Sequence, residues 1–90
     1  MARVAVVLKL YPESPEIDLE ALKARIKERL PEGYSIEGSD EEPIAFGLKA
    51  LKLIVSMPED VEGGTETLES LLMSIDGVGQ VEVEVVQRMG

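Results

Sequence analysis

The sequence contains no cysteine and no histidine, and each absence removes a class of function. Without cysteine the chain has no disulfides, no thiolate metal ligands and no nucleophilic thiols. Without histidine it lacks the commonest general base and the commonest metal ligand of proteins. An enzyme active near neutral pH would then depend on a carboxylate or a lysine with a shifted pKa. We therefore predict a protein without a metal site or a cofactor.

Aromatic residues and positive charges are also scarce. The only aromatic residues are Tyr11, Tyr34 and Phe46, so the core must consist mainly of valine, leucine and isoleucine. Nine basic residues stand against eighteen acidic ones, which gives a net charge of -9. This charge repels phosphate backbones and argues against direct binding of nucleic acid. A basic protein surface is the complementary partner.

Long apolar runs are missing as well. No run approaches the ~20 residues that a membrane-spanning helix needs, and the first residues lead into a strand-like segment without the layout of a signal peptide. We therefore expect a cytoplasmic protein with no membrane partner. Ninety residues, of which 44% are hydrophobic, suffice for one small domain over residues 1–90.

Hydrophobic periodicity predicts four strands. Residues 3–11 and 47–57 are apolar on both faces, which is typical of central strands. Residues 34–44 contain a polar stretch that suits only an irregular edge strand. Residues 78–87 alternate valine with glutamate, placing Val81, Val83 and Val85 on one face, and predict the other edge.

Helices are predicted between these strands. The first covers residues 18–30, with Asp18 as its N-cap, and the second is capped near Thr65 and ends at Gly77. The order β-α-β-β-α-β predicts a ferredoxin-like α+β fold, an antiparallel sheet of order 4-1-3-2 with both helices on one face. The periodicities place these residues in the core: Val6, Leu8, Leu22, Ile26, Leu53, Val55, Leu68, Leu72, Val81 and Val83.

Two segments carry a resemblance to a known family. The run Pro43-Ile44-Ala45-Phe46-Gly47-Leu48-Lys49-Ala50-Leu51-Lys52 and the ending Gln87-Arg88-Met89-Gly90 are similar to archaeal elongation factor 1-beta. The similarity runs the whole length of the chain. It implies a guanine-nucleotide exchange factor that promotes exchange of GDP for GTP on elongation factor 1-alpha and regenerates the form that binds aminoacyl-tRNA. It also implies that no covalent chemistry takes place.

Phe46 lies at the predicted turn between the second and third strands. Its ring either folds back as a hydrophobic plug or projects from the end of the sheet. The resemblance implies the second role, with Ile44, Phe46 and Gly47 at a contact with the GTPase. Exposed aromatic side chains are frequent hot spots of interfaces.

The C-terminal ending is the second candidate site. A terminal arginine such as Arg88 is ordinarily a solvated charge. The resemblance implies that Gln87, Arg88 and Met89 act together, with a basic residue that reaches the magnesium and phosphate site of the GTPase. The chain has Arg where related eukaryotic factors have Lys, and one extra Gly, so the same insertion geometry does not follow. The topology predicts about 30 Å between Phe46 and Arg88.

Other functions leave different signatures. A ferredoxin-like regulatory domain that binds a small molecule on its open face or at a dimer interface remains the alternative, whereas we expect a monomer when the protein is free. An acylphosphatase-like hydrolase requires a water-orienting asparagine, and the chain has none. The glycines before Thr65 lack the Lys-Ser/Thr pair of a phosphate-binding loop. The acidic loops at residues 37–42 and 59–62 are expected to be solvated surface.

Overall fold

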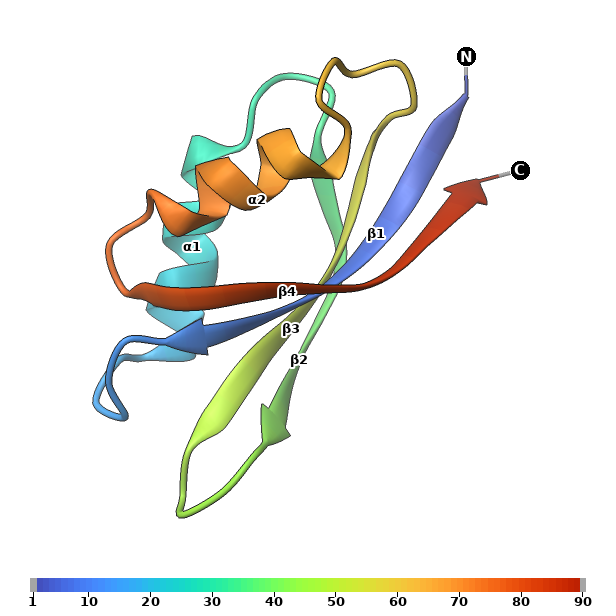
Figure 1. Cartoon of the computed structure of the whole chain (residues 1–90). Coiled ribbons are helices and arrows are strands. Elements are labelled where there is room, and N and C mark those ends of the chain that lie inside the picture. Colours follow the sequence, from blue (N-terminus) through green and yellow to red (C-terminus); the bar gives the residue numbers. More distant parts are fainter. Residues whose placement is uncertain (1, 90) are drawn as a thin grey trace.

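The computed structural model describes residues 2–89 and contains the predicted elements in the predicted order. These are β1 (Arg3–Pro12), α1 (Leu19–Arg29), β2 (Ser35–Pro43), β3 (Lys49–Pro58), α2 (Thr65–Met73) and β4 (Val78–Met89). The sheet order is β2-β3-β1-β4, with antiparallel neighbours, which is the predicted order 4-1-3-2 read from the other edge. Both helices lie on the same face of the twisted sheet (Figure 1). The ferredoxin-like fold is confirmed.

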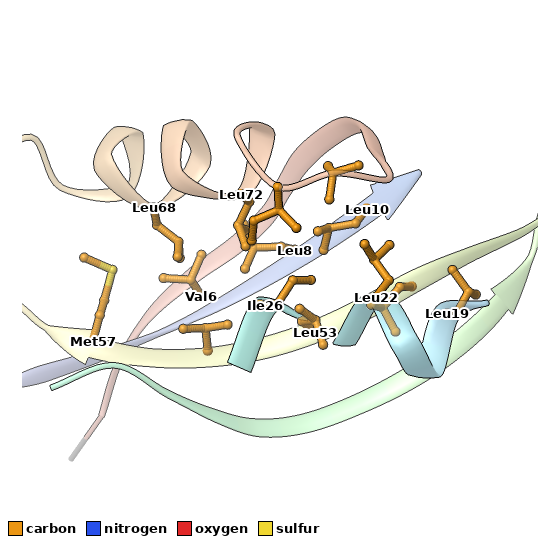
Figure 2. Close-up of a cluster of buried hydrophobic side chains, with 14 residues drawn as sticks. Val6, Leu8, Leu10, Leu19, Leu22, Ile26, Leu53, Met57, Leu68 and Leu72 are labelled. Carbon is orange, nitrogen blue, oxygen red and sulfur yellow. The ribbon is translucent and has the colours of Figure 1, made fainter. Parts of the chain in front are cut away.

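The core lies between the helices and this face of the sheet. Figure 2 shows side chains of both helices pointing toward those of β1 and β3. Eight of the ten predicted core residues are fully buried: Val6, Leu8, Leu22, Ile26, Leu53, Val55, Leu68 and Leu72. The other two, Val81 and Val83, are only partly buried at the edge of this cluster, because β4 is an edge strand.

A bulge in β4 overturns the predicted alternation of its valines. Val7 opposes Val85, but the next residue, Leu8, opposes Val83, so Glu84 is an extra residue without a partner. The insertion moves Val85 to the open face of the sheet beside Val7, where it is exposed. The prediction that Val85 shares a face with Val83 was therefore wrong.

The helix boundaries agree with the sequence in α1 and differ from it in α2. Asp18 caps α1 as predicted, because its side chain accepts a hydrogen bond from the Glu20 N–H at 3.0 Å. The N-cap of α2 is Gly64, which offers no side-chain cap, and the helix ends at Met73 instead of at Gly77. The hydroxyl of the next residue, Ser74, donates to the Leu71 carbonyl at 2.6 Å, a local bond that competes with continuation of the helix.

The face of the sheet opposite the helices carries ion pairs that join strands two positions apart in the sheet. The Lys9 ammonium lies 2.8 Å from Glu42 Oε2, so the pair reaches from β1 over β3 to β2. The Lys52 ammonium lies 3.5 Å from Glu84 Oε1, so this pair reaches from β3 over β1 to β4. Hydrogen bonding to Glu42 raises the pKa of Lys9, and the same bond lowers the pKa of Glu42. Both lysines are therefore engaged within the domain.

A polar network at the other end of this face surrounds Ser56, which is fully buried. Its hydroxyl donates to Glu37 Oε2 at 2.7 Å and accepts from Arg3 Nη2 at 3.0 Å. The Ser35 hydroxyl also donates to Glu37 Oε2, at 2.8 Å. These hydrogen bonds, the one from Ser56 first, lower the pKa of the Glu37 carboxyl, with a smaller contribution from the charge of Arg3. The network thus joins three strands where no helix covers them.

We expect Ser56→Ala to lower the free energy of unfolding by about 1–2 kcal/mol, since it removes the hydrogen bonds of a buried hydroxyl to a carboxylate and a guanidinium group. The substitution also removes the main cause of the low pKa of Glu37. A depressed carboxyl pKa stabilises the fold above the ordinary value of 4.5 and loses this contribution as the pH falls below it. Urea unfolding at about pH 7 and about pH 3 should therefore show a smaller difference between the two proteins at the lower pH. An equal difference at both pH values would contradict the role of Glu37.

Candidate functional site

The hairpin between β2 and β3 presents Phe46 to solvent. The side chain of Phe46 has a relative exposure of 101%, and its neighbour Ile44 is 40% exposed. Figure 1 shows the hairpin as the lower tip of the molecule, away from both helices. The ring therefore does not fold back as a plug. Sequence reasoning left these two alternatives open, and the structure selects the exposed one.

The turn that carries Phe46 also strains its backbone. The Leu48 N–H donates to the Ala45 carbonyl at 2.8 Å, and the residues between them, Phe46 and Gly47, have φ angles of 51° and 78°. Positive φ at both central positions indicates a type I′ turn, in which Asn, Asp and Gly are preferred. Phenylalanine at the first position has a steric cost and gains no burial. Its ring therefore contributes little to the stability of the free domain.

The end of β4 carries the other predicted site residues. Arg88 opposes Val4, whose neighbours along the same face of β1 pack beneath the helices, so Arg88 starts from the helix side of the sheet. Gln87 and Met89 start from the open side, because successive residues of a strand alternate. Met89 and the nearby Val86 are exposed. Gly90, which also belongs to the predicted ending, lies outside the described residues.

Arg88 is engaged by an acidic residue that sequence reasoning missed. Its Nη2 lies 2.7 Å from Oε1 and 2.9 Å from Oε2 of Glu59, in the loop after β3. Hydrogen bonding to Glu59 raises the pKa of Arg88. Glu59 is exposed, as expected for an acidic loop, but its carboxylate also has a partner that was not predicted. The predicted sheet order contained the signal, because it places the ends of β3 and β4 on either side of the start of β1.

The structure gathers the predicted residues into two groups and keeps the groups apart. One group is Ile44, Phe46 and Gly47, and the other is Gln87, Arg88 and Met89. β3 begins at the hairpin and runs in the same direction as β4, since both are antiparallel to β1. The longest dimension of the domain is 42 Å. The two groups therefore lie at opposite ends of the sheet and cannot line one pocket.

Metal sites and membrane-spanning helices are two other features that a small domain can contain. Within residues 2–89, no group of three carboxylates is placed to hold a metal ion. Neither helix in that part of the chain has both the length and the apolar character needed to cross a bilayer.

Comparison with known proteins identifies the family. The family model for the EF-1 guanine nucleotide exchange domain matches residues 5–89. Elongation factor 1-beta of Staphylothermus marinus and that of Aeropyrum pernix are each 61% identical to this chain over 89 residues, which cover 99% of both proteins. Elongation factor 1-beta of Metallosphaera sedula is 53% identical over 90 residues, which cover 100% of this chain and 99% of the relative. The chain therefore belongs to the family of EF-1 guanine nucleotide exchange domains.

Proposed function

We propose that this protein promotes exchange of GDP for GTP on a GTPase of the elongation factor 1-alpha type, and so regenerates the form that binds aminoacyl-tRNA. The observation that carries the proposal is the match to the exchange-domain family over residues 5–89. The protein makes and breaks no covalent bond. It acts in the cytoplasm and is a monomer when it is not bound to the GTPase, with residues 1–90 as one exchange domain.

The hairpin is the docking element in this proposal. A ring that is fully exposed and that strains its own turn is explained by a contact with another molecule. Aromatic side chains dominate the energetics of many interfaces because they bury a large apolar area with few rotatable bonds. Phe46 would therefore enter a pocket of the GTPase, with Ile44 beside it and Gly47 permitting the turn.

The end of β4 is the exchange element. The side chain of Arg88 is 74% exposed and stands beside Gln87 and Met89. A bound magnesium ion shields the phosphate charges of GDP, so a cation brought to that site competes with the ion or rearranges its ligands. Contact at the hairpin end would hold the factor in place while the β4 end acts. A large partner can accommodate both contacts because they lie at opposite ends of the domain.

The energetic basis of exchange is linkage between two binding equilibria. An exchange protein that binds the nucleotide-free GTPase more tightly than the GDP-bound form weakens the affinity of the GTPase for GDP in the same ratio. Exchange therefore requires that the contacts at the two ends be stronger when the nucleotide site is empty. The factor itself is released when GTP and magnesium bind again.

The experiment that tests the function uses elongation factor 1-alpha loaded with a fluorescent GDP analogue. The protein is added with an excess of unlabelled nucleotide, and the decay of fluorescence gives the rate of release. Release should accelerate with increasing factor and saturate. The proposal would be abandoned if the rate remained at its intrinsic value while a related factor of the same family accelerated it.

The contribution of the magnesium site gives a second expectation. Raising the magnesium concentration should slow the release that the factor stimulates, because the ion and the cation of Arg88 compete for the same region. Stopped-flow measurements at several magnesium concentrations, at constant ionic strength, would determine this dependence. The same titration with Arg88→Ala should show a weaker dependence. Stimulated release that is independent of magnesium would exclude competition at the ion site.

A further inference from the structure

Arg88 does not extend beyond the sheet in the free protein. One nitrogen of its guanidinium group, Nη2, contacts both carboxylate oxygens of Glu59, at 2.7 and 2.9 Å. These are the distances of a charge-assisted hydrogen bond. The guanidinium group that is proposed to contact the GTPase is thus directed toward its own domain in the free protein.

The backbone fixes the place of Glu59. Its N–H donates to the Ala2 carbonyl at 3.2 Å, next to the start of β1. Pro58 and Met89 both oppose Arg3, so the end of β3 and the end of β4 lie on either side of β1. This separation is two strand spacings, roughly 10 Å. A long arginine side chain and a glutamate side chain can close it only by reaching toward each other over β1.

The second arginine at this corner has different partners. Arg3 Nη2 donates to the Gly33 carbonyl at 2.6 Å and to the Ser56 hydroxyl at 3.0 Å. These contacts belong to the polar network of the open face. Arg3 therefore neither competes for Glu59 nor replaces Arg88. Among the interactions of the described residues, the contact of the Arg88 side chain is with one acidic side chain alone.

We propose that Glu59 acts as a latch on Arg88. In the free protein the carboxylate holds the guanidinium group against the end of β3. When the protein binds the GTPase, the nucleotide phosphates or the metal ligands at the GTPase site replace this carboxylate as the partner of Arg88. Glu59 is thereby a positioning residue for exchange, since it acts only through Arg88. The inference rests on the proposed function, because it takes Arg88 as the exchange-promoting group.

The exposure of the pair determines the strength of the latch. The side chains of Arg88 and Glu59 are 74% and 35% exposed, and ion pairs in such positions contribute little to stability because water and salt screen them. Such a latch opens without unfolding any part of the domain. Its removal should therefore change the rate of exchange modestly, by about two- to fivefold.

The test is Glu59→Gln, which keeps the size of the side chain and removes its charge. Its second-order rate constant for stimulated GDP release should rise about two- to fivefold at low salt, and the gain should shrink as salt is added. Asp60→Asn is the matched control, because it removes the same charge from the adjacent exposed residue, which forms no ion pair among the described residues. It measures the general effect of lowering the negative charge.

A double-mutant cycle separates the latch from other effects. In the background of Arg88→Ala, Glu59→Gln should have no more effect than Asp60→Asn. A spectroscopic measurement without the GTPase complements it: the Nε–Hε signal of Arg88 in NMR spectra should shift in Glu59→Gln, because the carboxylate charge beside the guanidinium group is removed. An unchanged Arg88 signal would overturn the latch.

The kinetic outcomes distinguish this inference from the proposed function. If Arg88→Ala slows release and Glu59→Gln does not speed it beyond the Asp60→Asn control, the latch is wrong and the role of Arg88 stands. If Glu59→Gln slows release, Glu59 assists Arg88 and does not restrain it, which also overturns the latch. If Arg88→Ala leaves release unchanged, the role of Arg88 fails and the latch fails with it.

Discussion

Arg88→Ala is expected to reduce stimulated GDP release by roughly tenfold or more while complex formation with nucleotide-free GTPase falls much less. The reason is the division between the two ends: the hairpin end holds the factor in place, and the cation at the end of β4 acts on the nucleotide site. Removal of one member of a charge pair that is desolvated in a complex is among the larger effects of single substitutions at interfaces. Stopped-flow release and equilibrium binding, measured on the same preparations, give the two quantities.

Two companion variants define the contribution of the side chain. Arg88→Lys should retain part of the activity, because the charge survives while the planar fork of donors is lost. Deletion of residues 87–90 should resemble Arg88→Ala in release. If the deleted protein releases GDP at the rate of the parent, the exchange element lies elsewhere, and the surface formed by β1 and β4 becomes the next candidate. The thermal stability of each variant should remain close to that of the parent, because Arg88 lies on the surface.

Phe46→Ala is expected to weaken binding to the GTPase by about 1–3 kcal/mol, which corresponds to roughly 5- to 150-fold. The stability of the free domain should hardly change, because the side chain is fully exposed. A buried phenylalanine would behave in the opposite way, with a loss of about 3–5 kcal/mol on truncation. Isothermal titration calorimetry and urea unfolding, applied to the same variant, separate the two cases.

Phe46→Gly sharpens this prediction, since it removes both the ring and the steric cost of a positive φ. The free domain should gain up to about 1 kcal/mol in unfolding free energy even as binding weakens. Met73→Ala is a suitable control, because it truncates another exposed apolar side chain, on α2. If Met73→Ala weakens binding as much as Phe46→Ala, the effect is one of general surface hydrophobicity, and Phe46 is not an anchor.

Local patterns in the sequence predicted most of the fold. Leu8 and Leu53 are buried because period-two alternation in an uninterrupted central strand leaves one face for the core. The pattern failed at Glu84, where an extra residue in β4 changes the face of Val85. A bulge depends on pairing with β1, which the sequence of β4 alone does not contain. The end of α2 was also missed, because the chain leaves the α-helix through 3₁₀-type hydrogen bonds from Ser74 to Leu71 and from Ile75 to Leu72 before it reaches Gly77.

The candidate site was predictable in part. The turn at Phe46 followed from the glycine after it, but the exposure of the ring depends on the surrounding hairpin and required the structure. Glu59 lay in a loop whose local sequence carried no signal beyond its acidic composition, and the wider signal was the predicted sheet order. Its contact with Arg88 joins residues 29 positions apart in the chain. Pairs of this kind follow from side-chain length, which each residue type gives, and from sheet order, which a local window of sequence does not contain.

The exposed hairpin tip also makes position 46 a natural place for an optical probe. The chain has no tryptophan, so Phe46→Trp would give a protein with a single indole fluorophore. Because the native ring touches little of its own domain, the larger ring should be accepted there without repacking the core. Its emission would start at the wavelength of an indole in water and move to the blue as the ring enters an apolar pocket. The docking step could then be followed directly in time, apart from the release of nucleotide.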